Sequence, residues 1–192
     1  EASKYPENNI LEIIVVDDCS EVPVEGAIRH EVNNGLSAAR NTGIKAAKGK
    51  YIVCLDDDNE LMPEFLEKTI ASIGEYDAIA VGRVIQYKDF ADFVVPLISK
   101  LSSIDWGWLI KKEVFDTIQY DENMKANEDT DFGIQFFKNY KATQLSEPLT
   151  IAYDSENPKE SLSFPSVREL EGMMYFYKKN FHEYNDPKEK WC

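Results

Sequence analysis

Residues 51–58, YIVCLDDD, join an uninterrupted apolar run to three consecutive aspartates. Residues 10–18, ILEIIVVDD, have the same arrangement nearer the start of the chain. Near-continuous apolar runs of this length are typical of strands in a parallel sheet that is covered on both faces. Ligands of such folds bind beyond the carboxyl ends of the strands. We therefore expect buried strands at 10–16 and 51–55, with their acids gathered at one edge of a sheet.

Helical and extended patterns alternate through the rest of the chain. Helical patterns cover 37–48, 63–73, 111–118, 128–140 and 166–181, and strand patterns cover 78–87, 104–110 and 149–153. Ser37 can cap the first helix, Gly49 ends it, and Pro63 begins the second. Pro96 interrupts the apolar residues of 90–101, which predicts irregular structure or a short helix there. The alternation predicts an α/β fold with a mainly parallel central sheet flanked by helices.

The length and composition favour a single domain with a substantial core. The chain has 192 residues, of which 43% are hydrophobic, and a chain of this size is usually one domain. We assign the α/β unit to residues 1–154. We assign a polar loop and an amphipathic helix that packs on this unit to residues 155–192. Gly82 and Arg83, in the middle of an expected strand, indicate a bend or a site.

The charge of the chain restricts its partners. Lys and Arg total 21 against 35 Asp and Glu, so the net charge is −14. This charge repels a polyphosphate backbone, so we expect no nucleic acid partner, and it disfavours binding to anionic lipid by charge alone. The sequence contains no apolar run long enough to span a membrane, which leaves peripheral membrane contact open.

The cysteines and histidines indicate the compartment and limit the kinds of metal site. Three cysteines without a CxxC pair predict free thiols in a reducing compartment, and the first residues show no signal peptide. We therefore expect a cytoplasmic protein. Only two histidines are present, which excludes a metal site built from several histidines.

Three groups of acids are candidates for chemistry, namely Asp17–Asp18, Asp56–Asp57–Asp58, and Glu128–Asp129 with Asp131. Two carboxylates 4 Å apart repel by about 4 kcal/mol at an effective dielectric constant near 20, so a cluster needs a compensating cation. Hard oxygen ligands suit Mg²⁺ or Mn²⁺, which keep open positions for substrate phosphates. The ordinary interpretation is that acids after strands are turn residues and that acids at a helix start interact with its dipole.

Four motifs occur in the order seen in family-2 glycosyltransferases of the GT-A fold. They are IIVVDDCS at 13–20, NNGLSAARN at 33–41, GKYIVCLDDD at 49–58 and EDTDFG at 128–133. The chain resembles this family from about residue 10 to residue 152. The resemblance implies that Asp18 hydrogen-bonds the nucleotide base, and that Arg40 lies near the base or the diphosphate.

The same resemblance implies a metal site and a catalytic base. Asp56 and Asp58 match the two acids of the D-x-D motif, with Asp58 holding Mn²⁺ or Mg²⁺. Asp56 or Asp57 would reach the ribose or the water shell of the metal. Asp129 resembles the catalytic base, with Glu128 beside it.

The implied activity is a metal-dependent, inverting transfer of a sugar from a nucleotide-diphosphate donor to an acceptor hydroxyl, as in polysaccharide biosynthesis. A UDP-sugar is the default donor, and the acceptor is a sugar or a lipid-linked molecule. Family members begin with a central strand that contacts the nucleotide. Residues 1–9 look instead like the tail of the helix that follows that strand, so we expect this strand to be missing from the sequence.

Other functions compete with sugar transfer. A module that lacks the first strand would bind a nucleotide or a protein partner without catalysis. An aspartyl-nucleophile phosphatase also has a D-x-D after an apolar strand, but it needs Thr or Val where this chain has Glu60. Leu61 replaces the glycine that a calcium-binding loop needs at its sixth position. A nucleotidyltransferase needs a glycine-rich N-terminal loop, which the sequence lacks.

Three further segments have two interpretations each. Trp106 and Trp108 either stack on a sugar ring or pack in the core. The polar residues 155–165 either close over the donor or form an exposed connection. The Met- and aromatic-rich face of the last helix either docks on a partner or membrane or packs on the domain.

Overall fold

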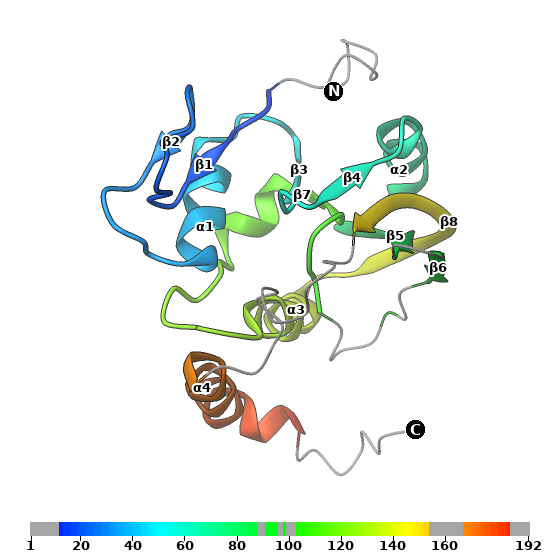
Figure 1. Cartoon of the computed structure of the whole chain (residues 1–192). Coiled ribbons are helices and arrows are strands. Elements are labelled where there is room, and N and C mark those ends of the chain that lie inside the picture. The colour runs from blue at the N-terminus through cyan, green and yellow to red at the C-terminus, as the bar shows by residue number, and fades with distance from the viewer. Residues whose placement is uncertain (1–11, 88–90, 96–97, 99–102, 154–166, 185–192) are drawn as a thin grey trace.

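The computed structural model describes residues 12–87, 91–95, 98, 103–153 and 167–184 (Figure 1). Its strands are β1 (Val16–Asp17), β2 (Ile28–Arg29), β3 (Tyr51–Val53), β4 (Asn59–Leu61), β5 (Ala78–Gln86), β6 (Ala91–Val94), β7 (Leu109–Lys111) and β8 (Ala142–Tyr153). Its helices are α1 (Leu36–Ala46), α2 (Phe65–Ile73), α3 (Glu128–Asn139) and α4 (Val167–Tyr184), with a 3₁₀ helix at Lys112–Asp116.

The described strands form two sheets. β1 pairs with β2 in parallel, and the larger sheet has the order β3-β7-β5-β8-β4 with β6 beside β5. In the larger sheet β5 and β8 run parallel, whereas the other pairs are antiparallel. The α/β class is therefore confirmed, but the expectation of a mainly parallel sheet is wrong. Antiparallel pairing needs no crossover helix, and β6 follows β5 after only a short connection.

The larger sheet curls because its two ends are joined by a short piece of chain. β3 and β4 lie at opposite ends of the strand order, yet only Cys54–Asp58 separates them in the sequence. This segment spans at most about 20 Å when fully extended, so the ends of the sheet approach each other. Gly107 N–H donates to Cys54 O at 2.9 Å, and Tyr153 N–H donates to Asp58 O at 3.3 Å. The D-x-D motif therefore closes the curled sheet and is held from both sides.

Gly82 marks an irregularity in the pairing of β5 with β8. The register shifts on both sides of Gly82. A Cβ atom at Gly82 would lie 2.7 Å from the carbonyl oxygens of Ser146 and Glu147. This distance is too short for a Cβ atom, so only glycine fits at this position. The pairing is therefore irregular at the predicted position, but β5 itself continues through Gly82 and Arg83, and the extra residues lie in β8.

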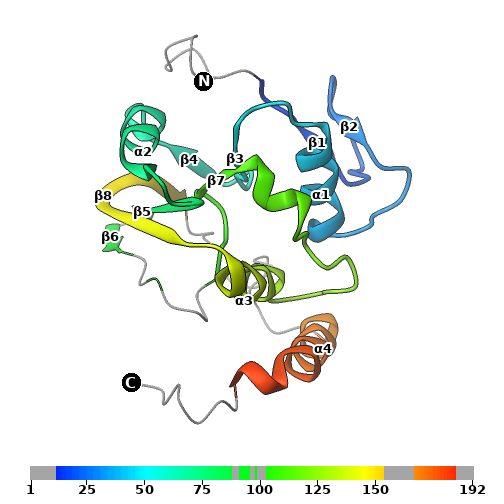
Figure 2. The ribbon, with the colours of Figure 1, turned by 180° about the vertical axis from the view of Figure 1, so that it is seen from behind.

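α1 and α3 pack on one face of the larger sheet and α2 packs on the other, because alternate residues of β5 belong to the two buried clusters (Figures 1 and 2). Ile44 of α1 and Phe132 and Phe136 of α3 belong to one buried cluster with Trp108, which is 2% exposed. Phe65 and Ile73 of α2 belong to a second cluster. The core interpretation of Trp108 is therefore confirmed. α4 lies against α3 on the side away from the sheet.

The extent of several elements differs from the expectation. Residues 91–94 form strand β6 instead of irregular structure or a helix, because they pair with the second half of β5. The strand expected at 104–110 begins only at Leu109, because Trp106 and Gly107 form a turn in which Gly107 has φ 78°. β8 begins earlier than predicted, at Ala142. The loop at 155–165 lies outside the described residues, and the division at residue 154 stays a prediction.

No helix among the described residues combines the length and the apolar character that crossing a bilayer requires.

Candidate functional site

A buried arginine joins two of the three acid clusters. Arg40 lies on α1, and its side chain is 8% exposed. Its Nη1 donates to Glu128 Oε1 at 2.9 Å, and its Nη2 donates to Asp56 Oδ1 at 3.1 Å. Its Cζ lies 5.2 Å from the ring centroid of Tyr120, which stacks on Phe132 in turn. The D-x-D segment and the start of α3 therefore meet at α1.

The electrostatic environment keeps Arg40 charged. Burial by itself lowers the pKa of Arg40, but Tyr120, Asp56 and Glu128 more than offset this effect, and the pKa is raised. A buried cation in this position compensates carboxylates that would otherwise repel each other. Small residues allow the close approach of α1 that this contact requires. A Cβ at Gly43 would lie 3.4 Å from Val16 Cγ2, so α1 packs directly on β1.

Asp129 is a half-buried acid beside this ion pair. α3 begins after Asn127, which has the left-handed φ of 60°. The Asp129 Oδ1 accepts a hydrogen bond from Thr130 N–H at 2.7 Å. Burial and the charge of Glu128 raise the pKa of Asp129, and the charge of Asp105 adds to this effect. Asp129 therefore holds a proton more tightly than an ordinary aspartate, which makes it a stronger base.

The remaining acids of the D-x-D motif lie at the surface. Asp57 and Asp58 are exposed, and burial together with the charges of Asp56 and Asp57 raises the pKa of Asp58. In the described part of the chain, no group of three ligating side chains surrounds a metal position. A Mg²⁺-type site often has only one or two carboxylates and takes its other ligands from phosphates and water. The donor set at Asp56 and Asp58 fits such an ion.

The first acid cluster differs from the other two because protein groups compensate it. Asp18 accepts hydrogen bonds from His30 Nδ1 at 2.7 Å, Asn34 N–H at 2.9 Å and Gly35 N–H at 2.7 Å. Burial by itself raises the pKa of Asp18, but the hydrogen bonds outweigh burial, and the pKa is lowered. The Asp18 carboxylate thus holds the turn from which α1 starts. Its contact with a nucleotide base stays a prediction.

Asp17 has a purely local set of partners. Its side chain is buried and pairs with Arg29. It also accepts hydrogen bonds from Ser20 N–H at 2.8 Å and Val24 N–H at 3.1 Å. The compensating metal cation that the sequence predicts for an acid cluster is therefore not needed at the first cluster, since Arg29 pairs with Asp17 and amide and His30 donors satisfy both carboxylates.

The sequence interpretation missed an ion pair next to Asp129. Arg83 donates to both Asp105 oxygens, at 2.8 and 2.9 Å, and its Cζ lies 4.6 Å from the ring centroid of Trp106. Arg83 was singled out as a bend or a site, but Asp105 was not. The only signal for Asp105 is its place before the aromatic turn that begins at Trp106. Trp106 is half-buried, and Arg83 lies over one face of its ring. Stacking of Trp106 on a sugar stays a prediction.

We predict that the Arg40 ion pairs stabilise the fold. Arg40→Met leaves Asp56 and Glu128 without their cation, and we expect a loss of roughly 2–4 kcal/mol in the free energy of unfolding. Adding Glu128→Gln should recover part of this loss, with a coupling above about 1 kcal/mol in a double-mutant cycle. Urea denaturation measures both values. Lys45→Met, at an exposed position of α1, is the control, and an equal effect of the two Met variants would contradict the prediction.

Comparison with known proteins identifies a family for the chain. The family model described as "Glycosyl transferase family 2" matches residues 3–140. The uncharacterized glycosyltransferase EpsJ of Bacillus subtilis (strain 168) is 26% identical, with 81% of this chain and 55% of EpsJ covered. The putative colanic acid biosynthesis glycosyl transferase WcaA of Escherichia coli (strain K12) is 25% identical, with 94% of this chain and 74% of WcaA covered.

A solved structure shares the fold. The S. aureus TarS 1–349 structure in complex with UDP-GlcNAc has a TM-score of 0.71 and 20% sequence identity, with 92% of this chain and 60% of TarS 1–349 covered.

An uncharacterized glycosyltransferase of Haemophilus influenzae (strain ATCC 51907 / DSM 11121 / KW20 / Rd) is 30% identical, with 73% of this chain and 57% of that protein covered. The chain thus spans little more than half the length of several relatives. Because the family model matches most of its residues, the chain belongs to glycosyl transferase family 2.

Proposed function

We propose that the protein transfers a sugar from a nucleotide-diphosphate donor to an acceptor hydroxyl, with inversion at the anomeric carbon. The observation that carries this proposal is the Arg40 bridge. It joins Asp56 of the D-x-D motif to Glu128, the neighbour of Asp129. The bridge brings the segment that would hold the donor diphosphate next to the segment that bears Asp129, which supports a single substrate site for both.

The donor is a nucleoside diphosphate sugar, and a UDP-sugar is the default. The TarS structure that shares this fold is a complex with UDP-GlcNAc, which supports the same class of donor here. Asp58, with Asp56, would hold Mn²⁺ or Mg²⁺, and the ion would supply Lewis-acid neutralisation of the diphosphate leaving group. Arg40 adds a positive charge beside this position. Asp56 or Asp57, which is exposed next to it, would reach the ribose or the water shell of the metal.

Asp129 acts as the general base. It accepts the proton of the acceptor hydroxyl while the hydroxyl oxygen attacks the anomeric carbon from the face opposite the diphosphate. The bond from that carbon to the diphosphate oxygen breaks in the same step, and the configuration inverts. Burial and the charge of Glu128 raise the pKa of Asp129, which strengthens it as a base. Glu128 is held by Arg40, so it shapes the environment of Asp129 from a fixed position.

We predict that Asp129→Asn lowers kcat by about 10²–10⁴-fold, the usual contribution of a general base. The amide keeps an oxygen for the Thr130 N–H, and it removes a charge that burial disfavours. The variant should therefore be at least as stable as the wild type at neutral pH. Donor hydrolysis and transfer assays, together with thermal melts, measure these effects. Asp116→Asn, at an exposed site, serves as the control. Transfer within about threefold of the wild type would exclude Asp129 as the base.

The pH dependence follows from the same residue. Asp129 must lose its proton to act, so kcat of the wild type should rise as the pH rises through the pKa of Asp129. Because this pKa is raised, the rise should lie at a higher pH than the pKa of an ordinary aspartate. The Asp129→Asn variant should lack this limb of the profile.

We predict that one nucleotide raises the melting temperature only together with a metal ion. The protein is melted with UDP, GDP, CDP or dTDP, each with and without Mn²⁺. A ligand at 100 times its Kd stabilises the fold by about 2.7 kcal/mol. Asp58→Asn should remove the effect of the metal. Metal-dependent binding without transfer or donor hydrolysis would favour the inactive binding module, and no shift with any nucleotide would contradict the donor site.

A further inference from the structure

The first turn of α3, which bears Glu128 and Asp129, is anchored residue by residue from several parts of the chain. Glu128 is held by Arg40 of α1 at 2.9 Å. Asp129 O accepts a hydrogen bond from Ile104 N–H at 3.1 Å. The Thr130 hydroxyl lies 2.7 Å from the hydroxyl of Ser103. Asp131 is the next residue, and its anchor comes from α4.

Asp131 is fully buried, and α4 supplies a cation and an amide to it. Lys179 Nζ donates to Asp131 Oδ2 at 2.9 Å, and Asn180 Nδ2 donates to Asp131 Oδ1 at 2.9 Å. The Asp131 side chain is 0% exposed. A carboxylate at this depth needs partners. Gln135 of α3 itself donates to Asp131 Oδ2 at 2.7 Å, and α4 supplies the cation.

Lys179 also holds the segment that contains Tyr120, whose ring packs against Arg40. Its Nζ donates to Asp121 Oδ2 at 2.8 Å, and Tyr175 OH donates to the same oxygen at 3.2 Å. Asp121 follows Tyr120, whose ring lies under the Arg40 guanidinium. Lys179 thus connects two segments behind the site in the way that Arg40 connects two segments within it.

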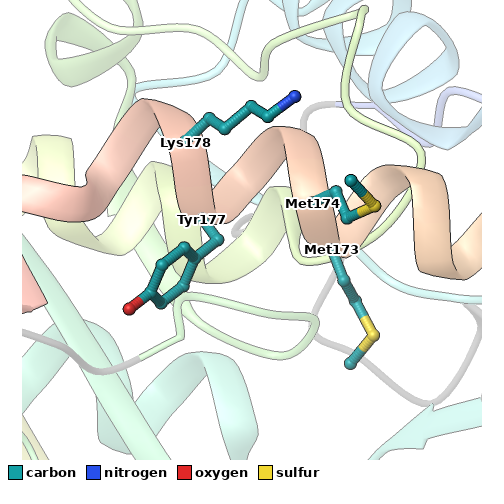
Figure 3. A pocket seen from close by; sticks show the side chains of 4 residues that line it. All are labelled: Met173, Met174, Tyr177 and Lys178. Atoms are coloured by element: carbon teal, nitrogen blue, oxygen red, sulfur yellow. The ribbon is translucent and has the colours of Figure 1, made fainter.

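Apolar packing fixes α4 in register with these bonds. Phe176, one turn before Asn180, is buried against Met124 and Ile134. α4 therefore presents Phe176, Lys179 and Asn180 to α3 and the preceding loop, as Figures 1 and 2 show for the helices themselves. Met173, Met174, Tyr177 and Lys178 of the same helix line a separate pocket (Figure 3).

We propose that Lys179 is a positioning residue for sugar transfer: by bridging Asp121 and Asp131 it holds Tyr120 and the first turn of α3 where Arg40 meets Glu128 and Asp129 is set to accept a proton. This inference rests on the proposed function. α4 is thereby part of the machinery that sets the geometry of the base, although Lys179 itself does not touch the substrate.

The test compares Lys179→Met with Lys178→Met, which removes the same charge from the neighbouring exposed position. We expect Lys179→Met to lower kcat by about tenfold or more while the Kd for the donor nucleotide stays within threefold of the wild type, because the donor site at Asp56 and Asp58 is held by other contacts. Lys179→Arg, which can still bridge two carboxylates, should retain at least half of the wild-type kcat. Lys178→Met should match the wild type.

Hydrogen exchange gives a readout that does not depend on activity. Amides of residues 128–134 should exchange faster in Lys179→Met than in Lys178→Met. If Lys179→Met does not fold, the double variant Asp131→Asn with Lys179→Met removes both charges. The double variant should fold and keep the low kcat, because the bridge is absent.

The outcomes separate this inference from the proposed function. Wild-type kcat in a folded Lys179→Met or in the double variant overturns the positioning role. Equal losses in kcat and donor affinity also overturn it, because they indicate general loosening of the fold. A wild-type protein without any transfer activity contradicts the proposed function, and in that case faster exchange in Lys179→Met would still support the anchoring of α3.

Discussion

The arrangement of the site depends on one buried cation. Arg40 is nearly enclosed and has carboxylates of two distant motifs within hydrogen-bond distance. Its charge offsets the repulsion between Asp56 and Glu128, which would otherwise oppose the approach of the D-x-D segment to the start of α3. The Tyr120 ring packs against the guanidinium of Arg40. This buried ion pair therefore joins the two motifs. Buried ion pairs often contribute little net stability compared with apolar packing, and their best-known role is to specify geometry.

The backbone brings these motifs together in two ways. The curled sheet places the D-x-D segment between β3 and β4, where Gly107 and Tyr153 hold it. The start of α3 reaches this segment through Arg40, and Lys179 of α4 anchors the same turn through Asp131. Among the described acids, Asp58 and Asp129 have a raised pKa. Both lie in the two motifs where ligand and proton chemistry is proposed.

Much of this arrangement could be predicted from the sequence, for local reasons. The helix predicted at 37–48 and the strand predicted at 51–55 are found at 36–46 and 51–53, and periodicity together with Gly49 between them located both. The predicted cap is wrong, since the residue before the helix is Gly35 and Ser37 makes no capping bond. The α/β class followed from the alternation of patterns. The direction of strand pairing did not, because a short strand such as β6 has no sequence signal that distinguishes the two directions. Residues 91–94 form a strand only because the far half of β5 offers an unpaired edge.

The ion pairs were less accessible to prediction than the motifs. Acid clusters are visible in the sequence, but their compensating partners are not. Asp17 and Asp18 resemble the other clusters in composition, yet hydrogen bonds from amides and His30 of the following loop satisfy them locally, and Arg29 pairs with Asp17. Asp105 and Lys179 carry no local pattern, since each becomes meaningful only through a partner far away in the sequence. Long-range charge pairing is a property of the tertiary structure, and a single sequence does not encode it in spacing.

A crystal structure of the protein with UDP and Mn²⁺ tests most directly whether the two motifs form one site. We expect the diphosphate beside Arg40, the ion on Asp58, and Asp129 open toward the place of the sugar, with the Arg40 contacts to Asp56 and Glu128 retained. A nucleotide bound on another face of the molecule, or an Arg40 that contacts neither acid, would show that these clusters do not share a pocket.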